Sequence, residues 1–495
     1  MTFRINYVLF FISLFFLYES VKAQELSRTL SLEEVIVMAR EQSLQGLLAR
    51  HRFRSSYWEY RTYVARFRPS LNLEATIPDL NRAYDRIILP TGEESFVERS
   101  SLNSDVELSL RQNVGFTGGT LFMNSGLQRI DILSEGGETS YLSTPLSVGF
   151  VQPISGFNIY KWQRKIEPLK YEEAKKRYLE SMEGVAIRAI DYFFDLALAQ
   201  INLEIARINF ENADTLYKIA EGRYNIGTIA ENELLQMELG TLNAGTALNE
   251  ANIELEAMQS QLRSFLGFNE NVNLTLLIPA EIPATEIEFA QAYDLAVENN
   301  PNMLALEREV LESDRNVAEA RSERGLNADL FASFGLTERA NTIPKAYQNP
   351  QDQQRVRLGL MLPIVDWGLN KGNYKMALSG HEVVRTQVAQ EKIDFEQAVF
   401  LQIMRFNLQD DQFYIAAKAD TIAQLRYDVT KQRFLIGKID VLDLNVALNE
   451  KDVARRAYVQ ALRNYWNYFY TIRRLTLYDF VEEVPLQEEY DDLIE

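Results

Sequence analysis

The segment Gly149-Phe150-Val151-Gln152-Pro153-Ile154 returns 210 residues later as Gly359-Leu360-Met361-Leu362-Pro363-Ile364. The same offset, without gaps, superposes a second region, where Tyr217, Arg223 and Gly227 fall on Tyr427, Arg433 and Gly437. One offset held over so long a stretch is typical of a duplicated structure. We therefore predict that the chain contains two copies of one structural unit.

A second offset, 257 residues, aligns the starts of the two copies, because Leu73 and Ala75 fall on Leu330 and Ala332. The two offsets differ by 47 residues, so the first copy carries an insertion between residues 76 and 148. We assign residues 24–285 to the first repeat, 286–480 to the second, and 481–495 to an acidic tail.

Each repeat contains two segments in which apolar and polar residues alternate, as in strands with one apolar face. The predicted strands span about residues 71–80 and 145–153 in the first repeat, and 327–337 and 354–363 in the second. Pro153 and Pro363 are expected to end strands and to mark the strand-to-helix junctions, because proline has no N–H for the ladder. The insertion holds another alternating hairpin, within residues 104–130.

Long helical patterns follow both prolines. Apolar residues recur at alternating steps of three and four, as Ile187, Ile190 and Phe194 do, which indicates a heptad seam. The chain turns at Gly227 and again at Gly437 and returns on a second helix each time. We predict long antiparallel helical hairpins over residues 161–266 and 371–474.

The amino terminus has the pattern of a cleaved signal peptide. Arg4 precedes an apolar run from Tyr7 to Tyr18, and Val21-Lys22-Ala23 follows as a small-residue cleavage site. A membrane anchor is the weaker interpretation, because the apolar run has about 12 residues and a spanning helix needs about 20. Residues 1–23 are therefore expected to be removed on export.

The composition excludes several classes of protein. The 495 residues include no cysteine and two histidines, so there is no disulfide framework, thiolate metal site or cysteine nucleophile. The net charge of −19 argues against a nucleic-acid partner. No carboxylate pair stands beside a nucleophile, a phosphate loop or a metal-ligand set, so we expect no enzyme activity, metal or cofactor.

Alternating strands on an exported chain raise the problem of sheet edges, because hydrocarbon tolerates only a closed barrel. The smallest single-chain outer-membrane barrel has eight strands, more than the four predicted here. Closure thus requires several chains that lend strands to one barrel. A ring of helical hairpins, whose seams bury against neighbours, would continue such a barrel as a tube.

These features resemble the TolC family of trimeric outer-membrane efflux proteins. The most specific stretch is Arg433-Phe434-Leu435-Ile436-Gly437-Lys438-Ile439-Asp440-Val441-Leu442-Asp443, which is similar to the family's aromatic-x-x-Gly tip and its hydrophobic-Asp-Val-Leu-Asp run. The first repeat has a weaker copy, Arg223-Tyr224-Asn225-Ile226-Gly227, followed by Glu231 and Glu233. Two departures are a gap of only two residues between Gly437 and Asp440, and the hairpin in the insertion.

The resemblance implies a mixed α and β fold. Three chains would share a twelve-stranded outer-membrane β-barrel, which continues into a long periplasmic coiled-coil barrel of helices. It also implies a homotrimer in the outer membrane of a Gram-negative-type bacterium, docked on a periplasmic adaptor and an inner-membrane transporter. The hairpin of the insertion either stands above the membrane or widens the barrel.

Asp440 and Asp443 are candidates for a periplasmic gate. They lie three apart at the start of a helix, so both can face one side, and Glu233 is the repeat partner of Asp443. In a threefold ring the two aspartates would place six carboxylates at the inner mouth, where the resemblance implies a cation-selective constriction. Alternatively, these acids only favour the helix dipole, which is worth from a few tenths to about 1 kcal/mol.

The two tips and the strand ends supply further candidates. Exposed turns that carry apolar residues often contact a partner, although the glycines also suit a helix C-cap. The candidates for adaptor docking are Arg223, Tyr224, Ile226, Gly227, Arg433, Phe434, Ile436 and Gly437. Phe157 and Trp367 sit just past strand ends, where an aromatic belt at the membrane interface would lie.

The leading functional hypothesis is a passive export duct, driven by the pump that it joins. The alternative is a structural coiled-coil scaffold of the cell envelope without transport activity, against which the alternating strands argue. The sequence does not indicate the cargo or the class of pump.

Overall fold

The computed structural model describes residues 27–133, 137–268, 272–283, 285–436, 438–439 and 441–494. The expected signal peptide at residues 1–23 lies outside these ranges. The chain divides into two compact units, 1–52 with 176–300 and 396–493, and 53–175 with 301–395 and 494–495. Each unit draws residues from both predicted repeats, so the units do not coincide with the repeats, and each is described by itself.

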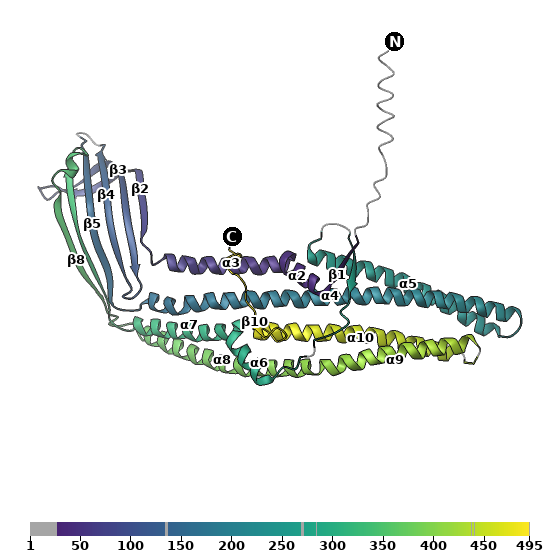
Figure 1. The fold of residues 1–495 in the computed structure, drawn as a ribbon. Coiled ribbons are helices and arrows are strands. Elements are labelled where there is room, and N and C mark those ends of the chain that lie inside the picture. Colours follow the sequence, from purple (N-terminus) through teal and green to yellow (C-terminus); the bar gives the residue numbers. More distant parts are fainter. Residues whose placement is uncertain are drawn as a thin grey trace, which may run out of the picture. The chain divides into compact units, whose positions relative to one another are not determined.

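The second unit contains a six-stranded antiparallel sheet in the order β2-β3-β4-β5-β7-β8. Its strands are β2 (Ser70–Ile88), β3 (Glu94–Val114), β4 (Gly119–Ile132), β5 (Thr139–Ser155), β7 (Asn327–Ala340) and β8 (Gln351–Met361). Figure 1 shows β2, β3, β4, β5 and β8 in one curved sheet. The hairpin of the insertion supplies β3 and β4, so the sheet has two strands more than the four expected.

The pairing of β5 with β7 joins the two repeats within the sheet, where Val148 lies opposite Phe334 and Gly149 opposite Ser333. Position 149 requires glycine because β7 approaches it closely: a Cβ there would lie 2.5 Å from the Ala332 carbonyl oxygen. The ring of Phe122 on β4 lies equally close to that position and stacks on Phe331, with ring centroids 5.7 Å apart.

The prediction that Pro153 ends a strand was wrong by two residues. β5 includes Pro153 and ends at Ser155, with an irregularity in its pairing with β7 between these two residues. A bulge accommodates proline in a sheet, because the ladder is interrupted there. Pro363 lies two residues beyond the end of β8, as the prediction required.

Three helices, α3 (Leu44–Ala65), α4 (Ile159–Asn225) and α8 (Leu369–Asn407), contribute residues to both units, and α7 (Pro301–Glu323) lies in the sheet-bearing unit. Within that unit, Tyr60 of α3 stacks on Tyr171 of α4 with ring centroids 4.6 Å apart. Arg308 of α7 donates to Glu173 of α4 over 2.8 Å. These contacts hold together the helical segments next to the sheet.

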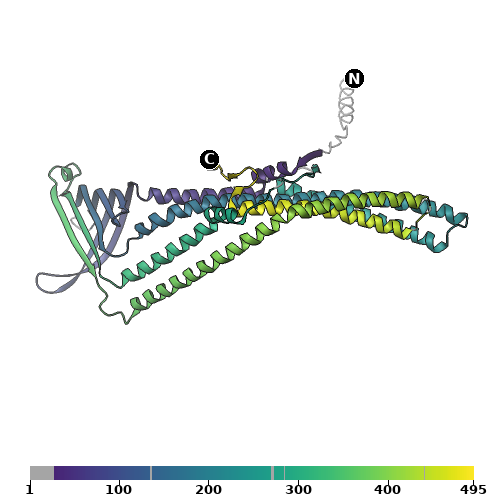
Figure 2. The ribbon, with the colours of Figure 1, turned by 60° about the horizontal axis from the view of Figure 1, so that its bottom comes forward.

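The first unit contains two helical hairpins. One is formed by α4 and α5 (Glu231–Leu266), and the other by α9 (Gln409–Leu435) and α10 (Val441–Thr476). Both Figure 1 and Figure 2 show α9 beside α10. The unit also holds α2 (Leu32–Gln42), α6 (Phe289–Asn299), the parallel strands β1 (Ser27–Ser31) and β6 (Asn273–Leu277), and the short strands β9 (Tyr478–Asp479) and β10 (Val484–Pro485).

The expected long helix of the second hairpin is interrupted at Leu408, between α8 and α9. The side-chain amide of Gln409 donates to the carbonyl of Arg405 over 2.8 Å. A side chain that enters the backbone ladder in this way is a recognised cause of helix breaks.

The core of the first unit forms around the middle of α4. Ile190, Phe194 and Ala197, which belong to the predicted heptad seam, are fully buried there beside Leu262 of α5 and Leu462 of α10. Within the described ranges, no helix combines the length and apolar character that crossing a lipid bilayer requires.

A buried ionic network lies at one edge of this core. The carboxylate of Glu183 accepts from Arg40 of α2 and, over 3.2 Å, from Arg473 of α10, which also pairs with Asp479. Removing one member of such a network leaves an uncompensated charge. The network thus fixes α10 against α4 and α2.

Candidate functional site

The turn between α4 and α5 has the geometry of a glycine C-cap. Gly227 adopts a φ of +73°, and its N–H donates to the Tyr224 carbonyl over 2.8 Å. The N–H of Thr228 donates to the Arg223 carbonyl over 2.9 Å, and the Thr228 hydroxyl donates to the same oxygen over 2.9 Å. Glycine takes this left-handed conformation without the steric cost that other residues meet.

The turn between α9 and α10 repeats the same closure 210 residues later. The N–H of Lys438 donates to the Arg433 carbonyl over 3.0 Å, as Thr228 donates to Arg223. Gly437 and Asp440 themselves lie outside the described residues. The repeat detected in the sequence thus extends to an individual backbone hydrogen bond at the tips.

The predicted docking residues differ in accessibility. Ile226 is 75% exposed and Ile436 is 66% exposed, and Tyr224 and Arg433 are exposed as well. Arg223 is half-buried. The predicted exposure of Phe434 was wrong, because this residue is only 7% exposed.

Phe434 is buried because it packs inside the chain. It forms a cluster with Tyr427 of α9 and Leu444 of α10, and Leu216 of α4 packs against that cluster. The aromatic residue of the tip motif therefore joins the second hairpin to the first rather than facing solvent.

The described acidic candidates lie in the first turns of two different helices. Glu233 belongs to the first turn of α5 and Asp443 to that of α10, and both are exposed. The N-cap residue of α5, Ala230, makes no side-chain hydrogen bond to the first turn. Two acids in that turn, Glu231 and Glu233, complement the positive end of the helix dipole.

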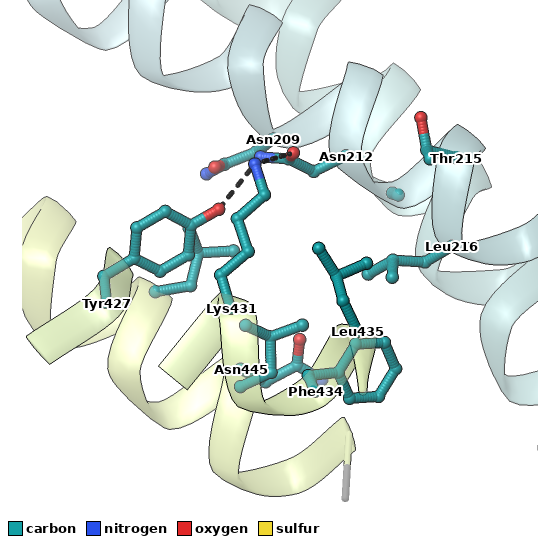
Figure 3. A pocket seen from close by; sticks show the side chains of 12 residues that line it. Asn209, Asn212, Thr215, Leu216, Tyr427, Lys431, Phe434, Leu435 and Asn445 are labelled. Carbon is teal, nitrogen blue, oxygen red and sulfur yellow. Dashed lines mark hydrogen bonds between the residues drawn. The ribbon is translucent and has the colours of Figure 1, made fainter. Parts of the chain in front are cut away.

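A polar link joins the two hairpins at residues of α4 that precede the tip. Asn209 of α4 donates through Nδ2 to Oδ2 of Asp452 on α10 over 2.8 Å. Asn212 of α4 donates through Nδ2 to the hydroxyl oxygen of Tyr427 over 3.2 Å, and its Oδ1 accepts from Nζ of Lys431 over 3.1 Å. We call Asn209, Asn212, Tyr427, Lys431 and Asp452 the polar link. Figure 3 labels the first four of these residues.

The polar link lies in poorly hydrated surroundings. Asp452 is only 5% exposed, and its Oδ1 pairs with Nζ of Lys451 over 3.2 Å. That ammonium lies 4.6 Å from the centre of the Tyr427 ring. Burial raises the pKa of the Tyr427 hydroxyl, with smaller contributions from the carboxylates of Asp428 and Asp452. The hydroxyl therefore stays neutral and remains available to Asn212.

A cavity of about 90 Å³ adjoins the polar link. It is lined from α4 by Asn209, Asn212 and Leu216, and from the second hairpin by Tyr427, Lys431 and Phe434, among others. Protein interiors are normally close-packed. The cavity between the two helical hairpins therefore leaves room for them to shift.

Sequence reasoning did not single out the polar link, although one signal was available. The steps of three and four along α4 place Asn212 on the continuation of the seam that Ile201 and Ile208 follow. A lone asparagine in such a seam favours one pairing at a cost in stability. The partner Asp452 could not be found this way, because it lies 243 residues away.

Two helices of the first unit carry exposed apolar seams. On α5 the seam consists of Leu235, Leu239, Leu242 and Ile253, and on α9 of Ile415, Ile422, Leu425 and Val429. All eight side chains are more than half exposed and follow heptad spacing. We call these rows the α5 seam and the α9 seam.

The predicted interface aromatics also differ from each other. Trp367, between β8 and α8, is 96% exposed, whereas Phe157, between β5 and α4, is half-buried. Trp367 has a φ of +53°, an unusual value for a residue with a side chain. The tight turn after β8 holds the indole away from the rest of the chain.

Residues 292–476 match the family model described as outer membrane efflux protein. The search of curated proteins found no match.

Solved structures match nearly the whole chain. The outer membrane channel CmeC of Campylobacter jejuni is 15% identical with a TM-score of 0.66, and the match covers 94% of this chain and 88% of that one. The outer membrane protein VceC of Vibrio cholerae is 12% identical with a TM-score of 0.62, covering 92% and 97%. A membrane protein from Pseudomonas aeruginosa is 13% identical with a TM-score of 0.64, covering 90% of each chain. These findings confirm the resemblance to the TolC family and the mixed α and β fold.

Proposed function

We propose that this chain, which carries an outer membrane efflux protein domain on the fold of outer-membrane efflux channels, is one subunit of a passive, homotrimeric export duct. The duct spans the outer membrane of a Gram-negative-type bacterium as a shared β-barrel and continues through the periplasm as a tube of helices. A periplasmic adaptor and an inner-membrane transporter supply the cargo and the energy.

The observation that carries this proposal is the sheet. Its order makes β2 and β8 the two edges of the described sheet, and one of its faces is apolar. Open edges beside an apolar face are not tolerated in hydrocarbon, where every backbone group needs a partner. Pairing β2 of one chain with β8 of the next resolves both edges in a closed ring.

The two exposed seams support the same assembly. The α5 seam and the α9 seam lie on different helices, so the contact between neighbouring chains joins two unlike surfaces. Such contacts close into a ring when the rotation between subunits allows it. Three chains would then bury six seams in three identical interfaces.

We place the periplasmic gate at the tips. The polar link holds the second hairpin against α4, and the cavity beside it gives the hairpin space to move outward. Asp443 and Asp440, repeated three times around the axis, would give the mouth a preference for cations. The exposed acids at the start of α5 contribute to the same negative potential.

The adaptor docks, in this proposal, on those predicted tip residues that are exposed. Ile226, Ile436 and Tyr224 are apolar or aromatic side chains that are exposed at the tips, and exposed apolar residues of this kind often mark a partner surface. Phe434 is removed from the docking surface because it is buried. The matched control for any docking experiment is Arg207, an exposed residue of α4 away from the turn.

A photo-reactive residue at position 226 or 436 is expected to cross-link the periplasmic adaptor in native membranes, because both side chains protrude from the tips. The same residue at position 207 is expected to give at least about tenfold less of this product, since a contact must fall within van der Waals reach. Mass spectrometry of the cross-linked bands is the measurement. An adaptor band of equal strength from position 207 would contradict docking at the tips.

The scaffold alternative accounts for the coiled coils but not for the apolar face of the sheet. Within the described ranges, no group of three or more His, Cys, Asp or Glu side chains is placed to hold a metal ion. The duct, in contrast, uses the sheet, the seams and the tips together.

The experiment that tests the duct is conduction through the purified protein. Detergent-extracted trimers are expected to insert into planar bilayers and to give discrete conductance steps. A protein that stays soluble as a monomer without detergent and gives no steps would refute the proposal.

A further inference from the structure

We propose that the barrel of this protein has eighteen strands rather than twelve, because each of three chains contributes all six strands of its sheet. This inference rests on the proposed function, which supplies the membrane and the three chains. The outer face of the hairpin β3–β4 would then contact lipid, and its inner face would line the pore. The alternative places this hairpin outside the hydrocarbon region.

The pairing register integrates the hairpin fully into the sheet. β2 pairs with β3 from Ser70 opposite Arg111 to Ile88 opposite Glu94, with one irregularity between Thr76 and Asp79. β3 pairs with β4 without interruption, from Ser101 opposite Ile132 to Val114 opposite Gly119. Removing β3 and β4 from the barrel would break both of these ladders and the ladder between β4 and β5.

The turn between β3 and β4 lies at the end of the sheet that joins the helices. Asn113 donates through Nδ2 to the Arg66 carbonyl over 3.0 Å, and Gln152 donates through Nε2 to the Thr117 carbonyl over 3.0 Å. Asn158, at the start of α4, donates to the Phe116 carbonyl over 3.4 Å. A hairpin that stood above the membrane would not place its turn among the strand-to-helix junctions.

Small residues make these contacts possible. A Cβ added to Gly115 would lie 3.0 Å from the Phe67 ring, so this glycine lets the turn approach the end of the helical segment. Gly118 has a φ of +79°, a conformation that favours glycine. The turn therefore packs at the end of the sheet where β2 begins and β5 ends.

The apolar band of the sheet continues across the hairpin. Leu108 of β3 lies opposite Leu73 of β2, and Leu110 lies opposite both Leu71 of β2 and Met123 of β4. On β4, Met123 faces Val148 of β5. Strand residues two apart share a face, so these leucines and their neighbours form one apolar row that continues through Val148 of β5 to Phe334 of β7.

The opposite face of the same strands is mainly polar, apart from the stacked rings of Phe122 and Phe331. Asp105, Glu107 and Arg111 alternate with the apolar residues of β3. On β8 the corresponding face carries Arg355 and Arg357, whose guanidinium groups lie 5.9 Å and 5.5 Å from the centre of the Phe331 ring. Apolar-out and polar-in alternation is the pattern of strands in a transmembrane barrel.

The consequence concerns the width of the outlet. Barrel diameter grows about linearly with strand number, so eighteen strands give a barrel about 1.5 times as wide as twelve. Barrels of 16–18 strands leave an aqueous channel. With a charged lining and that width, the outer-membrane barrel admits bulky, hydrated cargo and does not set the size limit of the duct.

Single cysteines provide the test, because the chain has no native cysteine. Leu108→Cys and Glu107→Cys probe the two faces of β3, and Leu358→Cys and Arg357→Cys probe β8, a strand that both strand counts place in the membrane. Trimers of each variant in lipid vesicles are treated with a water-soluble maleimide. The recovery of trimers is checked for each variant before labelling.

Leu108→Cys and Leu358→Cys are both expected to react at least about tenfold more slowly than their partners Glu107→Cys and Arg357→Cys, because a thiol in apolar surroundings has a raised pKa and little thiolate. If Leu108→Cys reacts as fast as Glu107→Cys while Leu358→Cys stays protected, β3 lies outside the membrane and the barrel does not have eighteen strands. If Leu358→Cys is also unprotected, the membrane barrel itself is refuted, and with it the proposed function.

Discussion

Replacing Ile422 or Leu239 by aspartate is expected to yield a folded monomer and to abolish the trimer. Both residues lie at the middle of exposed seams, Ile422 on α9 and Leu239 on α5. Burying a side chain of this size stabilises a contact by about 1.5–3 kcal/mol. The proposed ring has three identical interfaces, so each substitution would act three times in one trimer.

An aspartate in the seam adds a second penalty, because its charge would be desolvated opposite an apolar surface. The combined loss in each interface exceeds the roughly 1.4 kcal/mol that changes an association constant tenfold. The monomer should keep its fold, since neither side chain belongs to the core around Ile190 and Leu462. Light scattering of the detergent-purified protein measures the mass, and circular dichroism measures the helix content.

Thr421→Asp is the matched control. It introduces the same charge one residue before Ile422 on an exposed face of α9, where Asp428 already places an acid nearby. This variant should remain trimeric. A trimer that survived Ile422→Asp and Leu239→Asp unchanged would show that the seams do not form the contact between chains.

The repeat made much of the architecture predictable from the sequence. A gapless offset of 210 residues placed both strand-to-helix junctions and both helical hairpins, and the hydrogen bonds from Thr228 and Lys438 keep that offset. Alternation along Leu71 and Leu73 predicted one apolar face for the strands. These features are local or periodic, so a single sequence contains their full signal.

Features that depend on distant partners were not predictable. The alternation of the β3–β4 hairpin was visible, but its place between β2 and β5 follows from pairing that the pattern does not encode. Phe434 is in a motif that suggests exposure, yet Leu216 of the other repeat helps to bury it. Asn209 and Asp452 meet across two hairpins, and no spacing rule connects them.

Replacing Asn209 and Asn212 together by alanine is expected to open the gate and to raise the conductance of single channels strongly. The double variant removes the three hydrogen bonds by which α4 holds the second hairpin in the polar link. Hydrogen bonds to charged groups contribute about 1.5–3 kcal/mol and neutral ones about 0.5–1.5 kcal/mol. Two of the three bonds involve a charged partner, Asp452 or Lys431.

The expected shift is therefore about 3.5–7.5 kcal/mol in favour of separated hairpins, which is a change of more than about 300-fold in the ratio of open to closed states. Asp452 also favours the open state in this variant. Its buried Oδ2 has lost its donor, and water can solvate this oxygen when the hairpins separate. Asn252→Ala is the matched control, since the Asn252 side chain donates to the Leu248 carbonyl of its own helix and takes no part in the polar link. It should conduct as the unchanged protein does.

The open variant also separates the two interpretations of the tip carboxylates. Adding Asp440→Ala and Asp443→Ala to it removes six charges from the mouth of a trimer, so the preference for cations in a planar bilayer should fall if these groups line the passage. If they serve only the helix dipole, the selectivity stays unchanged, and the free energy of unfolding falls by about 1 kcal/mol or less for each helix start. If the double variant Asn209→Ala/Asn212→Ala conducts no more than Asn252→Ala, the polar link does not hold the gate closed. Breaking the contacts between the hairpins would then have left the passage as narrow as before.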